Sequence, residues 1–119
     1  MNVLGIDHVQ VAAPAGCEAA ARAFYGALVG LVEVEKPEAL RASGGCWFEV
    51  GAQELHVGVE EPFVPARKAH PSLVVADLHA LAGRLRDAGV DVVPDHAIPG
   101  TLRFYVADPF GNRLEFRQA

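Results

Sequence analysis

Polar and apolar residues alternate with two different periods along the first half of the chain. Period-two alternation predicts a half-buried strand over residues 6–12, and Pro14-Ala15-Gly16 ends it. The alanine-rich residues 17–28 predict a helix that ends near Gly30. Its apolar face is formed by Ala20, Ala23, Phe24 and Leu28. Three short strands are predicted to follow, over residues 31–35, 46–50 and 54–59.

The second half repeats this order of elements. A strand is predicted over residues 70–76, and Asp77 is a good N-cap for a helix that runs to about Ala88, before Gly89. The apolar face of this helix is formed by Leu78, Leu81, Leu85 and Ala88. Three more strands are predicted, over residues 90–93, 103–107 and 113–117. Residues 108–111 read as the turn between the last two.

The repeated order predicts an α+β protein made of two βαβββ modules in tandem, in one domain that spans residues 1–119. Module one covers about residues 1–60, and module two covers residues 69–119. The proline-containing stretch at about 61–68 reads as the linker. Because a four-stranded sheet of this size buries one face poorly, the two modules are expected to pair around a curved mixed sheet.

Composition and charge exclude several classes of partner. The chain is 51% hydrophobic and 21% charged, as expected of a folded globular protein. A net charge of −5 argues against a nucleic-acid partner, because nothing could neutralise a run of phosphates. No stretch is apolar enough to cross a membrane, and no signal peptide is recognised. The two cysteines, too few for a disulfide framework, fit a cytoplasmic protein.

Alternation in the strands leaves one face of each module polar, and donor residues recur there. Each module places one such residue at its first strand and one at its last: His8 and His56, then His70 and Glu115. Polar outward residues need no function, but this recurrence favours a shared site. Three imidazoles and a carboxylate suit Zn, Ni, Co, Mn or Fe(II). His79 and His96, in contrast, are expected to be surface residues.

Five segments carry a resemblance to a known family. They are Asp7–Ala12, Ala23–Tyr25, Leu28–Leu31, Glu54–Gly58 and Phe104–Glu115. The last segment is the most specific, because it is close to the family ending D-P-x-G-N-x-x-E. On these residues the chain resembles the glyoxalase / bleomycin-resistance / extradiol-dioxygenase superfamily, also called the vicinal oxygen chelate proteins. The resemblance covers essentially the whole chain.

The resemblance implies a homodimer and a divalent metal site that often takes ligands from both subunits. The family's metal positions fall on His8, His70 and Glu115, with the fourth at His56. Glu115 is also expected to act in catalysis, as a proton shuttle. The predicted contacts to a small oxygen-rich substrate come from residues on the same polar face: Gln10, Trp47, Ser72, Tyr105 and Arg113.

Position 56 separates the possible functions without choosing among them. Family members that isomerise hemithioacetals usually carry a carboxylate or an amide there, whereas this chain has His56. The leading prediction is a metal-dependent glyoxalase-like lyase or isomerase. The alternatives are an Fe(II) extradiol-type dioxygenase, for which two histidines and a glutamate suffice, and a non-catalytic drug- or metabolite-binding protein. The complete set of donor residues favours an enzyme over the binding protein.

Overall fold

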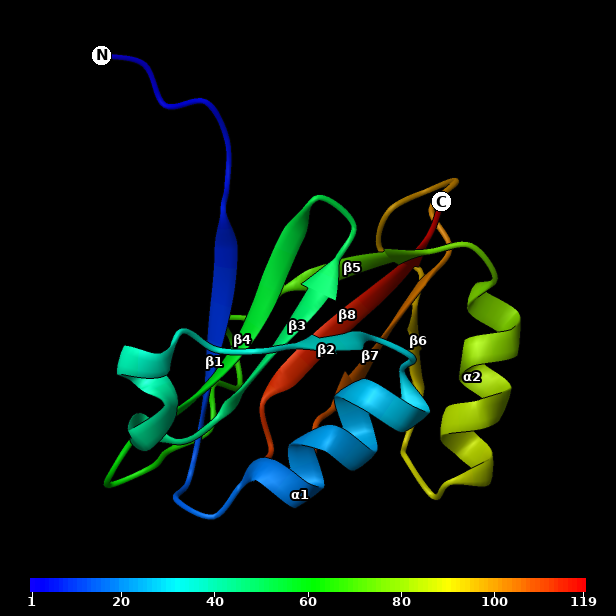
Figure 1. Ribbon diagram of the computed structural model, residues 1–119. Helices are drawn as coiled ribbons and strands as arrows, with labels where there is room; N and C mark the ends of the chain where they lie inside the picture. Colours follow the sequence, from blue (N-terminus) through cyan, green and yellow to red (C-terminus); the bar gives the residue numbers. More distant parts are fainter. The chain divides into compact units, whose positions relative to one another are not determined.

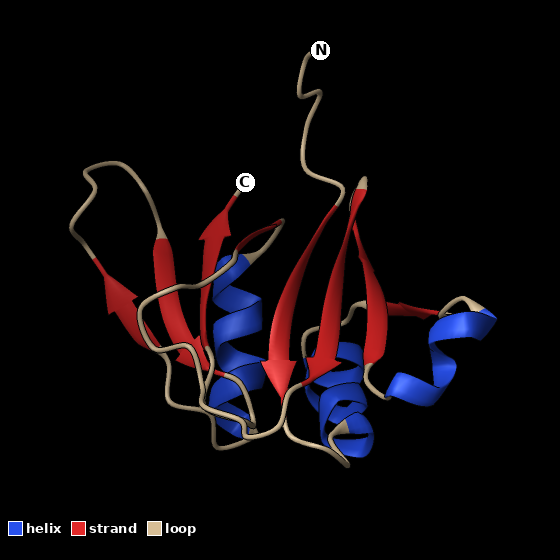
Figure 2. Cartoon of the chain, turned by 90° about the vertical axis from the view of Figure 1, so that its left-hand side faces the viewer, coloured by secondary structure: helices blue, strands red, loops and turns tan.

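The computed structural model describes residues 1–119 and divides into two compact units, Met1–Val64 and Pro65–Ala119, here called unit 1 and unit 2 (Figure 1). Each unit is built on one four-stranded mixed sheet with a helix, as the cartoon in Figure 2 also shows. The predicted α+β fold with two βαβββ modules is therefore confirmed. No helix of the structure is both long and apolar enough to cross a membrane.

In unit 1 the sheet has the strand order β1-β4-β3-β2, with β1 parallel to β4 and the other pairs antiparallel. Its strands are β1 (His8–Ala13), β2 (Val32–Val34), β3 (Cys46–Val50) and β4 (Gln53–Val59). The helical segments are α1 (Glu18–Ala21), its π-helical continuation η1 (Arg22–Leu28) and the 3₁₀ helix η2 (Glu38–Ser43). The segment η2 has no counterpart in the sequence prediction.

In unit 2 the order is β5-β8-β7-β6, again with the first pair parallel and the others antiparallel. The strands are β5 (Ser72–Val75), β6 (Val93–Asp95), β7 (Arg103–Ala107) and β8 (Arg113–Gln118). The helix α2 (Leu78–Asp87) begins after Asp77, whose side chain accepts a hydrogen bond from the Ala80 backbone N–H. This confirms the predicted N-cap.

Apolar side chains alternate onto the helix-covered face of each sheet. In unit 1 the fully buried strand residues include Cys46, Phe48, Leu55 and Val57. In unit 2 the buried strand residues include Phe104, Val106, Leu114 and Phe116, which share the core with Leu81 and Leu85 of α2. Because strand side chains alternate, the residues between them point to the opposite face, here called the open face of each sheet.

Local backbone geometry corrects four predictions. The first helix buries Ala21, Phe24 and Tyr25, and leaves Ala23 exposed. A π-helical turn holds more residues than an α-helical turn, so the buried face rotates away from the spacing assumed for an α-helix. The predicted strand at residues 90–93 is wrong, because β6 begins at Val93 and continues through Pro94. Proline is tolerated there because β6 is an edge strand.

The third correction concerns the boundary of β5. The strand was expected to begin at His70, but it begins at Ser72, so His70 lies in the loop before it, separated by Pro71. Ala88, expected on the apolar face of α2, is its exposed C-cap residue. The position of His70 matters for the site, because the side chain of a loop residue need not follow the alternation of strand side chains between the two faces of the sheet.

The two thiols are expected to be unreactive in the folded protein. Cys17 and Cys46 are free and buried. Burial, reinforced by the neighbouring Glu18 carboxylate, raises the pKa of Cys17 from 9.0 to about 11. At pH 8 this leaves about 100-fold less thiolate than an ordinary thiol has. A thiol reagent should therefore label the native protein slowly and the urea-unfolded protein at once, whereas equal rates would contradict the burial of both sulfurs.

The same shift has a consequence for stability against pH. The folded pKa of Cys17 lies above the unfolded value, so the unfolded chain loses its thiol proton first as the pH rises. The contribution of Cys17 to stability is therefore complete below pH 9 and decreases between pH 9 and about 11.

Candidate metal and substrate site

The open face of unit 1 carries a stack of three aromatic rings. The Trp47 and His56 rings are parallel within 1°, with centroids 3.8 Å apart. The His8 ring lies on His56 at 4.1 Å, with an interplanar angle of 17°. His56 faces Trp47 across the antiparallel pair of β3 and β4, and Gln10 of β1 on its other side. Strand register thus brings together Trp47, His56 and Gln10, all three of which were predicted to be site residues.

The two histidines of this stack differ in exposure and in hydrogen bonding. The His8 side chain is 44% exposed, and its Nδ1 lies 2.8 Å from the Asp7 carboxylate. The His56 side chain is 4% exposed, and its Nε2 lies 2.9 Å from the Glu54 carboxylate. In each neutral ring the nitrogen that faces the carboxylate carries the proton, because the second nitrogen has no competing acceptor; the second nitrogen is Nε2 in His8 and Nδ1 in His56.

An imidazole nitrogen binds a metal in the plane of its own ring. The planes of His8 and His56 are nearly parallel, so they do not converge on a common ion close to both rings. As the rings stand, at most one of the two histidines can bind a given ion. The His8 ring is exposed and its Nε2 is free, whereas the His56 ring is buried in the stack.

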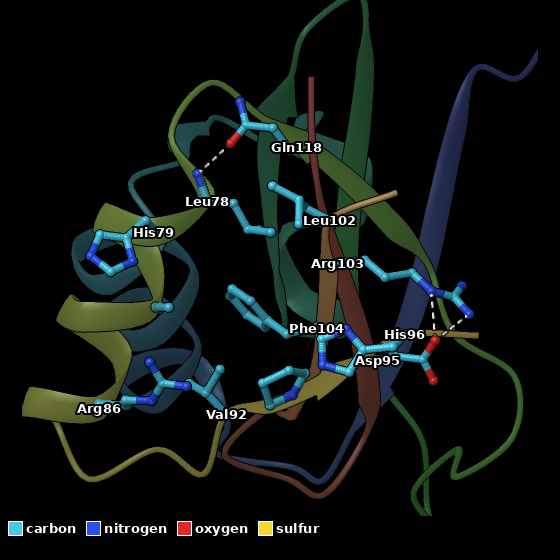
Figure 3. A pocket seen from close by; sticks show the side chains of 12 residues that line it. Leu78, His79, Arg86, Val92, Asp95, His96, Leu102, Arg103, Phe104 and Gln118 are labelled. Atoms are coloured by element: carbon cyan, nitrogen blue, oxygen red, sulfur yellow. Dashed lines mark hydrogen bonds and ion pairs between the residues drawn. The ribbon is translucent and has the colours of Figure 1, made fainter. Parts of the chain in front are cut away.

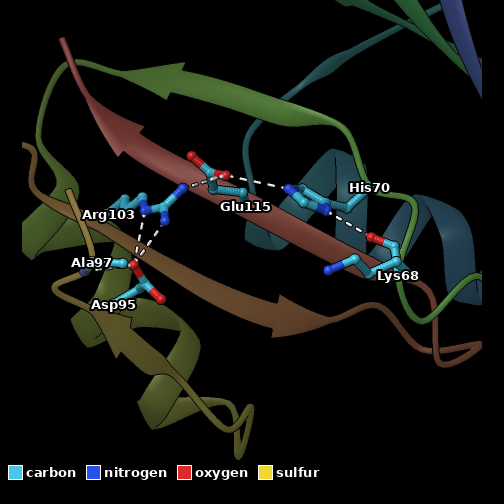
Figure 4. A network of polar contacts seen from close by, with 6 residues as sticks. All are labelled: Lys68, His70, Asp95, Ala97, Arg103 and Glu115. Carbon is cyan, nitrogen blue, oxygen red and sulfur yellow. Dashed lines mark hydrogen bonds and ion pairs between the residues drawn. The ribbon is translucent and has the colours of Figure 1, made fainter.

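Unit 2 places His70 and Glu115 in contact, as Figure 4 shows. The His70 Nδ1 lies 2.9 Å from the Lys68 carbonyl oxygen, and its Nε2 lies 3.3 Å from Glu115 Oε1. A carbonyl oxygen can only accept a hydrogen bond, so Nδ1 carries the proton and donates it. In the neutral ring Nε2 is then an acceptor that faces a carboxylate acceptor. A proton or a metal ion between the two atoms removes this conflict.

The spacing of these two atoms also fits a metal ion. Two donors that each lie about 2.1 Å from one ion are about 3.0–3.5 Å apart in octahedral or tetrahedral geometry. The hydrogen bond from Nδ1 to a backbone carbonyl is the usual support of a metal-binding histidine. The donor chemistry of this pair therefore fits a divalent cation, although the structure contains no group of three or more His, Cys, Asp or Glu side chains that could hold one.

Glu115 lies at the centre of a polar network on the open face of unit 2. Arg103 Nη1 donates to Glu115 Oε1 over 3.2 Å, while Nε and Nη2 of the same guanidinium donate to Asp95 Oδ1 over 3.0 and 2.8 Å (Figure 4). Burial acts to raise the pKa of Glu115, but a hydrogen bond from Ser72, a hydrogen bond from His70 when its Nε2 carries a proton, and the charge of Arg103 together lower it by more. The net effect lowers the pKa, so the carboxylate is ionised.

The remaining predicted site residues of unit 2 surround this carboxylate. Ser72 of β5 and Tyr105 of β7 face Glu115 from the neighbouring strands on either side. The His70 ring meets the Tyr105 ring edge-on, with centroids 5.2 Å apart. The Arg113 guanidinium lies 3.9 Å from the centroid of the same tyrosine ring. All of the predicted residues of this half are therefore gathered on one face.

Sequence reasoning missed the residues that hold these groups in place. Arg103 and Asp95 were not expected to be site residues, nor was Glu54. A signal for Arg103 was available, because it precedes Tyr105 by two residues and therefore shares its face. Asp95 carried no such signal, because the strand that contains it was predicted to end two residues earlier.

A second hollow lies on the helix side of unit 2, between α2 and the strands β6 and β7 (Figure 3). Its volume is about 260 Å³, and its floor includes Leu78, Val92 and Phe104. His79 and His96 line it as exposed residues, in agreement with their predicted surface position. Neither His70 nor Glu115 lines this hollow, but Arg103 and Asp95 do, so it borders the polar network around Glu115.

Comparisons with known proteins identify the family. The family model described as "Glyoxalase-like domain" matches residues 10–116. The crystal structure of a protein from Bacillus anthracis, assigned to the glyoxalase family, superimposes on this chain with a TM-score of 0.96. The two sequences are 53% identical, and the match covers 99% of this chain and 97% of that one. Two more distant structures share the fold: a lactoylglutathione lyase from Agrobacterium tumefaciens (21% identity, TM-score 0.75, 100% and 96% covered) and the fosfomycin resistance protein FosX from Listeria monocytogenes (12%, 0.76, 99% and 95%). A search of the curated proteins found no match. This chain belongs to the glyoxalase-like domain family of the vicinal oxygen chelate superfamily.

Proposed function

We propose that this protein is a metal-dependent lyase or isomerase of the glyoxalase type, which acts on a small oxygen-rich substrate. The observation that carries the proposal is the approach of His70 Nε2 to Glu115 Oε1, with Nδ1 of the same ring bonded to a carbonyl. Two acceptors that face each other at 3.3 Å favour a cation between them, and the bond from Nδ1 to the Lys68 carbonyl holds the ring in place. The cation is one of Zn, Ni, Co, Mn or Fe(II).

The proposed ligands are His70, Glu115 and His8, and a second copy of the chain can supply the third in a homodimer. His8 qualifies because its Nδ1 bonds to Asp7 and leaves Nε2 free in an exposed ring. His56, buried in the ring stack, is assigned to support His8 by packing against it. This assignment narrows the set of four donor residues expected from the sequence to three ligands and one support.

The side chains around Glu115 have distinct roles in this proposal. A bound divalent ion supplies Lewis-acid stabilisation to negative charge that develops on substrate oxygens. The ionised Glu115 carboxylate accepts and returns a proton, and Arg103 keeps it oriented through the bond to Oε1. The proposed substrate contacts come from both open faces: Gln10, Trp47, Ser72, Tyr105 and Arg113.

A turnover assay tests the function directly. The chelator-stripped protein is reloaded with each metal and supplied with hemithioacetals formed from an α-ketoaldehyde and a small thiol. We expect metal-dependent isomerisation, which the substitution Glu115→Gln abolishes. Oxygen uptake with catechols and Fe(II) would replace the proposal with a dioxygenase. Tight binding of a metabolite by the stripped protein, without turnover, would replace it with a binding protein.

The role of His56 gives a separate prediction. His56→Phe preserves a flat ring between Trp47 and His8 and removes every nitrogen donor at this position. We expect the metal affinity to stay within about threefold of the wild-type value, because the ligands are unchanged. Metal titration with calorimetric detection measures this. A fall as large as that caused by loss of His70 would show that His56 is itself a ligand.

A further inference from the structure

A hollow of about 420 Å³ lies in unit 2 at the end of β7 and the start of β8, and Tyr105 and Arg113 of the open face line it. Two arginines line it, Arg67 from the loop before β5 and Arg113 from the start of β8. The only acidic residue of the lining is Asp91. The other residues are Tyr105, the small or aliphatic Val93, Val106 and Ala107, and Gly111. The lining thus combines an excess of positive charge with an apolar wall.

The arginines are not committed to carboxylates of the chain. Neither Arg67 nor Arg113 makes a side-chain hydrogen bond or ion pair, in contrast to Arg103, which binds Asp95 and Glu115. The guanidinium of Arg113 lies 3.9 Å from the centroid of the Tyr105 ring. Stacking on an aromatic ring orients the guanidinium and leaves the N–H groups along its edges able to donate.

Hydrogen bonds of the Ala66 backbone hold the two arginines beside each other. The Ala66 N–H donates to Asn112 Oδ1 over 3.0 Å, and the Arg113 N–H donates to the Ala66 carbonyl over 2.8 Å. The Asn112 side chain donates in turn to the buried Asp108 carboxylate over 2.9 Å. Ala66, the neighbour of Arg67, is therefore hydrogen-bonded both to Asn112 and to Arg113. Ordering both side chains costs less when their backbones are already fixed.

The hollow is also within reach of the proposed chemistry. Tyr105 lines it, faces Glu115 across β7 and β8, and contacts the edge of the His70 ring. Arg113 and Glu115 are two residues apart on the same face of β8, a separation of about 7 Å. A small molecule can therefore extend from the arginines to the His70–Glu115 pair.

We propose that this hollow is a carboxylate-binding subsite, in which Arg67 and Arg113 hold the carboxylate of an organic acid. The apolar wall favours an organic acid over an inorganic anion, because it covers the carbon skeleton. The subsite's role in catalysis rests on the proposed function. In that role, the substrate is an acid whose vicinal oxygens lie toward Glu115. Arg67 and Arg113 then determine specificity and take no part in proton transfer.

Binding of 4-fluorobenzoate to the full-length chain, followed by ¹⁹F NMR with a chelator present, tests the subsite without any metal. We expect saturable binding of 4-fluorobenzoate and none of the neutral 4-fluorobenzamide at the same concentration. Arg113→Gln and Arg67→Gln should each weaken binding by about tenfold, as expected for loss of one charge-assisted hydrogen bond. The matched control is Arg117→Gln, which changes a residue on the same face of β8 that does not line the hollow.

Three outcomes would overturn the subsite. They are equal binding of acid and amide, an Arg117→Gln loss as large as that of Arg113→Gln, and displacement of the acid by an equal concentration of inorganic phosphate. Metal affinity measured on the same variants separates the two proposals. If the anion binds but no variant and no wild-type protein binds metal, the proposed function fails and the subsite stands. If metal binds and the anion does not, the subsite fails and the proposed function stands.

Discussion

His70→Ala should lower the affinity for a divalent metal by at least about 100-fold, since it removes one of the two ligands that face each other in unit 2. Glu115→Gln should have an effect of the same order, because an amide is a weak ligand and carries no charge. The fold should survive both changes. His70 is only partly buried in a loop, and Glu115→Gln keeps the volume of a buried side chain.

A control for the histidine is available on the same unit. His79→Ala removes an exposed imidazole of α2 that lies on the helix side of the sheet. Metal titration of the three variants and the wild-type protein, monitored by calorimetry, should show a normal affinity for His79→Ala alone. An unchanged affinity in His70→Ala would exclude this residue from the metal site.

Asn112→Ala should destabilise the protein by about 2–4 kcal/mol, the largest loss of stability that we expect from a single polar substitution. Asn112 is 1% exposed, and Asp108 is 4% exposed. The substitution removes the donor to Asp108 Oδ2 and the acceptor of the Ala66 N–H. A buried carboxylate that loses a hydrogen bond keeps its desolvation penalty, so the cost exceeds that of an exposed bond.

Urea unfolding monitored by circular dichroism measures the effect. The matched control is Asp77→Ala, which removes the exposed cap of α2 and should cost about 1 kcal/mol. The midpoint should decrease in both variants, by more in Asn112→Ala, with little change in the slope against urea. A smaller loss in Asn112→Ala than in Asp77→Ala would show that the turn does not depend on this network.

Strand alternation made the open faces predictable from the sequence. His8 and His56, and likewise Tyr105 and Glu115, occur at positions whose parity alone assigns them to the polar side. The helix α2 was equally accessible, because Asp77 and the spacing of Leu78, Leu81 and Leu85 are local signals. Where local signals and hydrophobic periodicity agree, the predicted elements match the structure closely.

The predictions failed where backbone geometry or long-range contacts decide the outcome. No residue type marks the π-helical turn that brings Tyr25 into the core beside Phe24. The edge position of β6, which tolerates Pro94, follows from the order of strands in the sheet. The pairing of Arg67 with Arg113 depends on hydrogen bonds between Ala66 and residues 46 and 47 positions later in the chain. Hydrophobic patterning carries no information about such bonds.

The arrangement of rings on unit 1 was equally hidden. Parity places His8 and His56 on one face, but it cannot distinguish two ligands of one ion from two stacked rings. The offset between parallel strands pairs His8 with Glu54 and leaves Gln10 facing His56, so that the rings lie over each other. The sequence therefore predicted the members of the donor set, whereas their different roles follow from side-chain geometry.

The most direct test of the metal site is a calorimetric titration of tag-free, chelator-stripped protein with Ni, Co, Zn, Mn and, without oxygen, Fe(II). We predict one ion bound per chain, with an affinity that depends on His70 and Glu115 and hardly on His56. A preference for Ni, Co or Zn would support the lyase or isomerase, and a preference for Fe(II) would direct the substrate search to catechols. If none of the five ions binds, the metal-dependent function is contradicted.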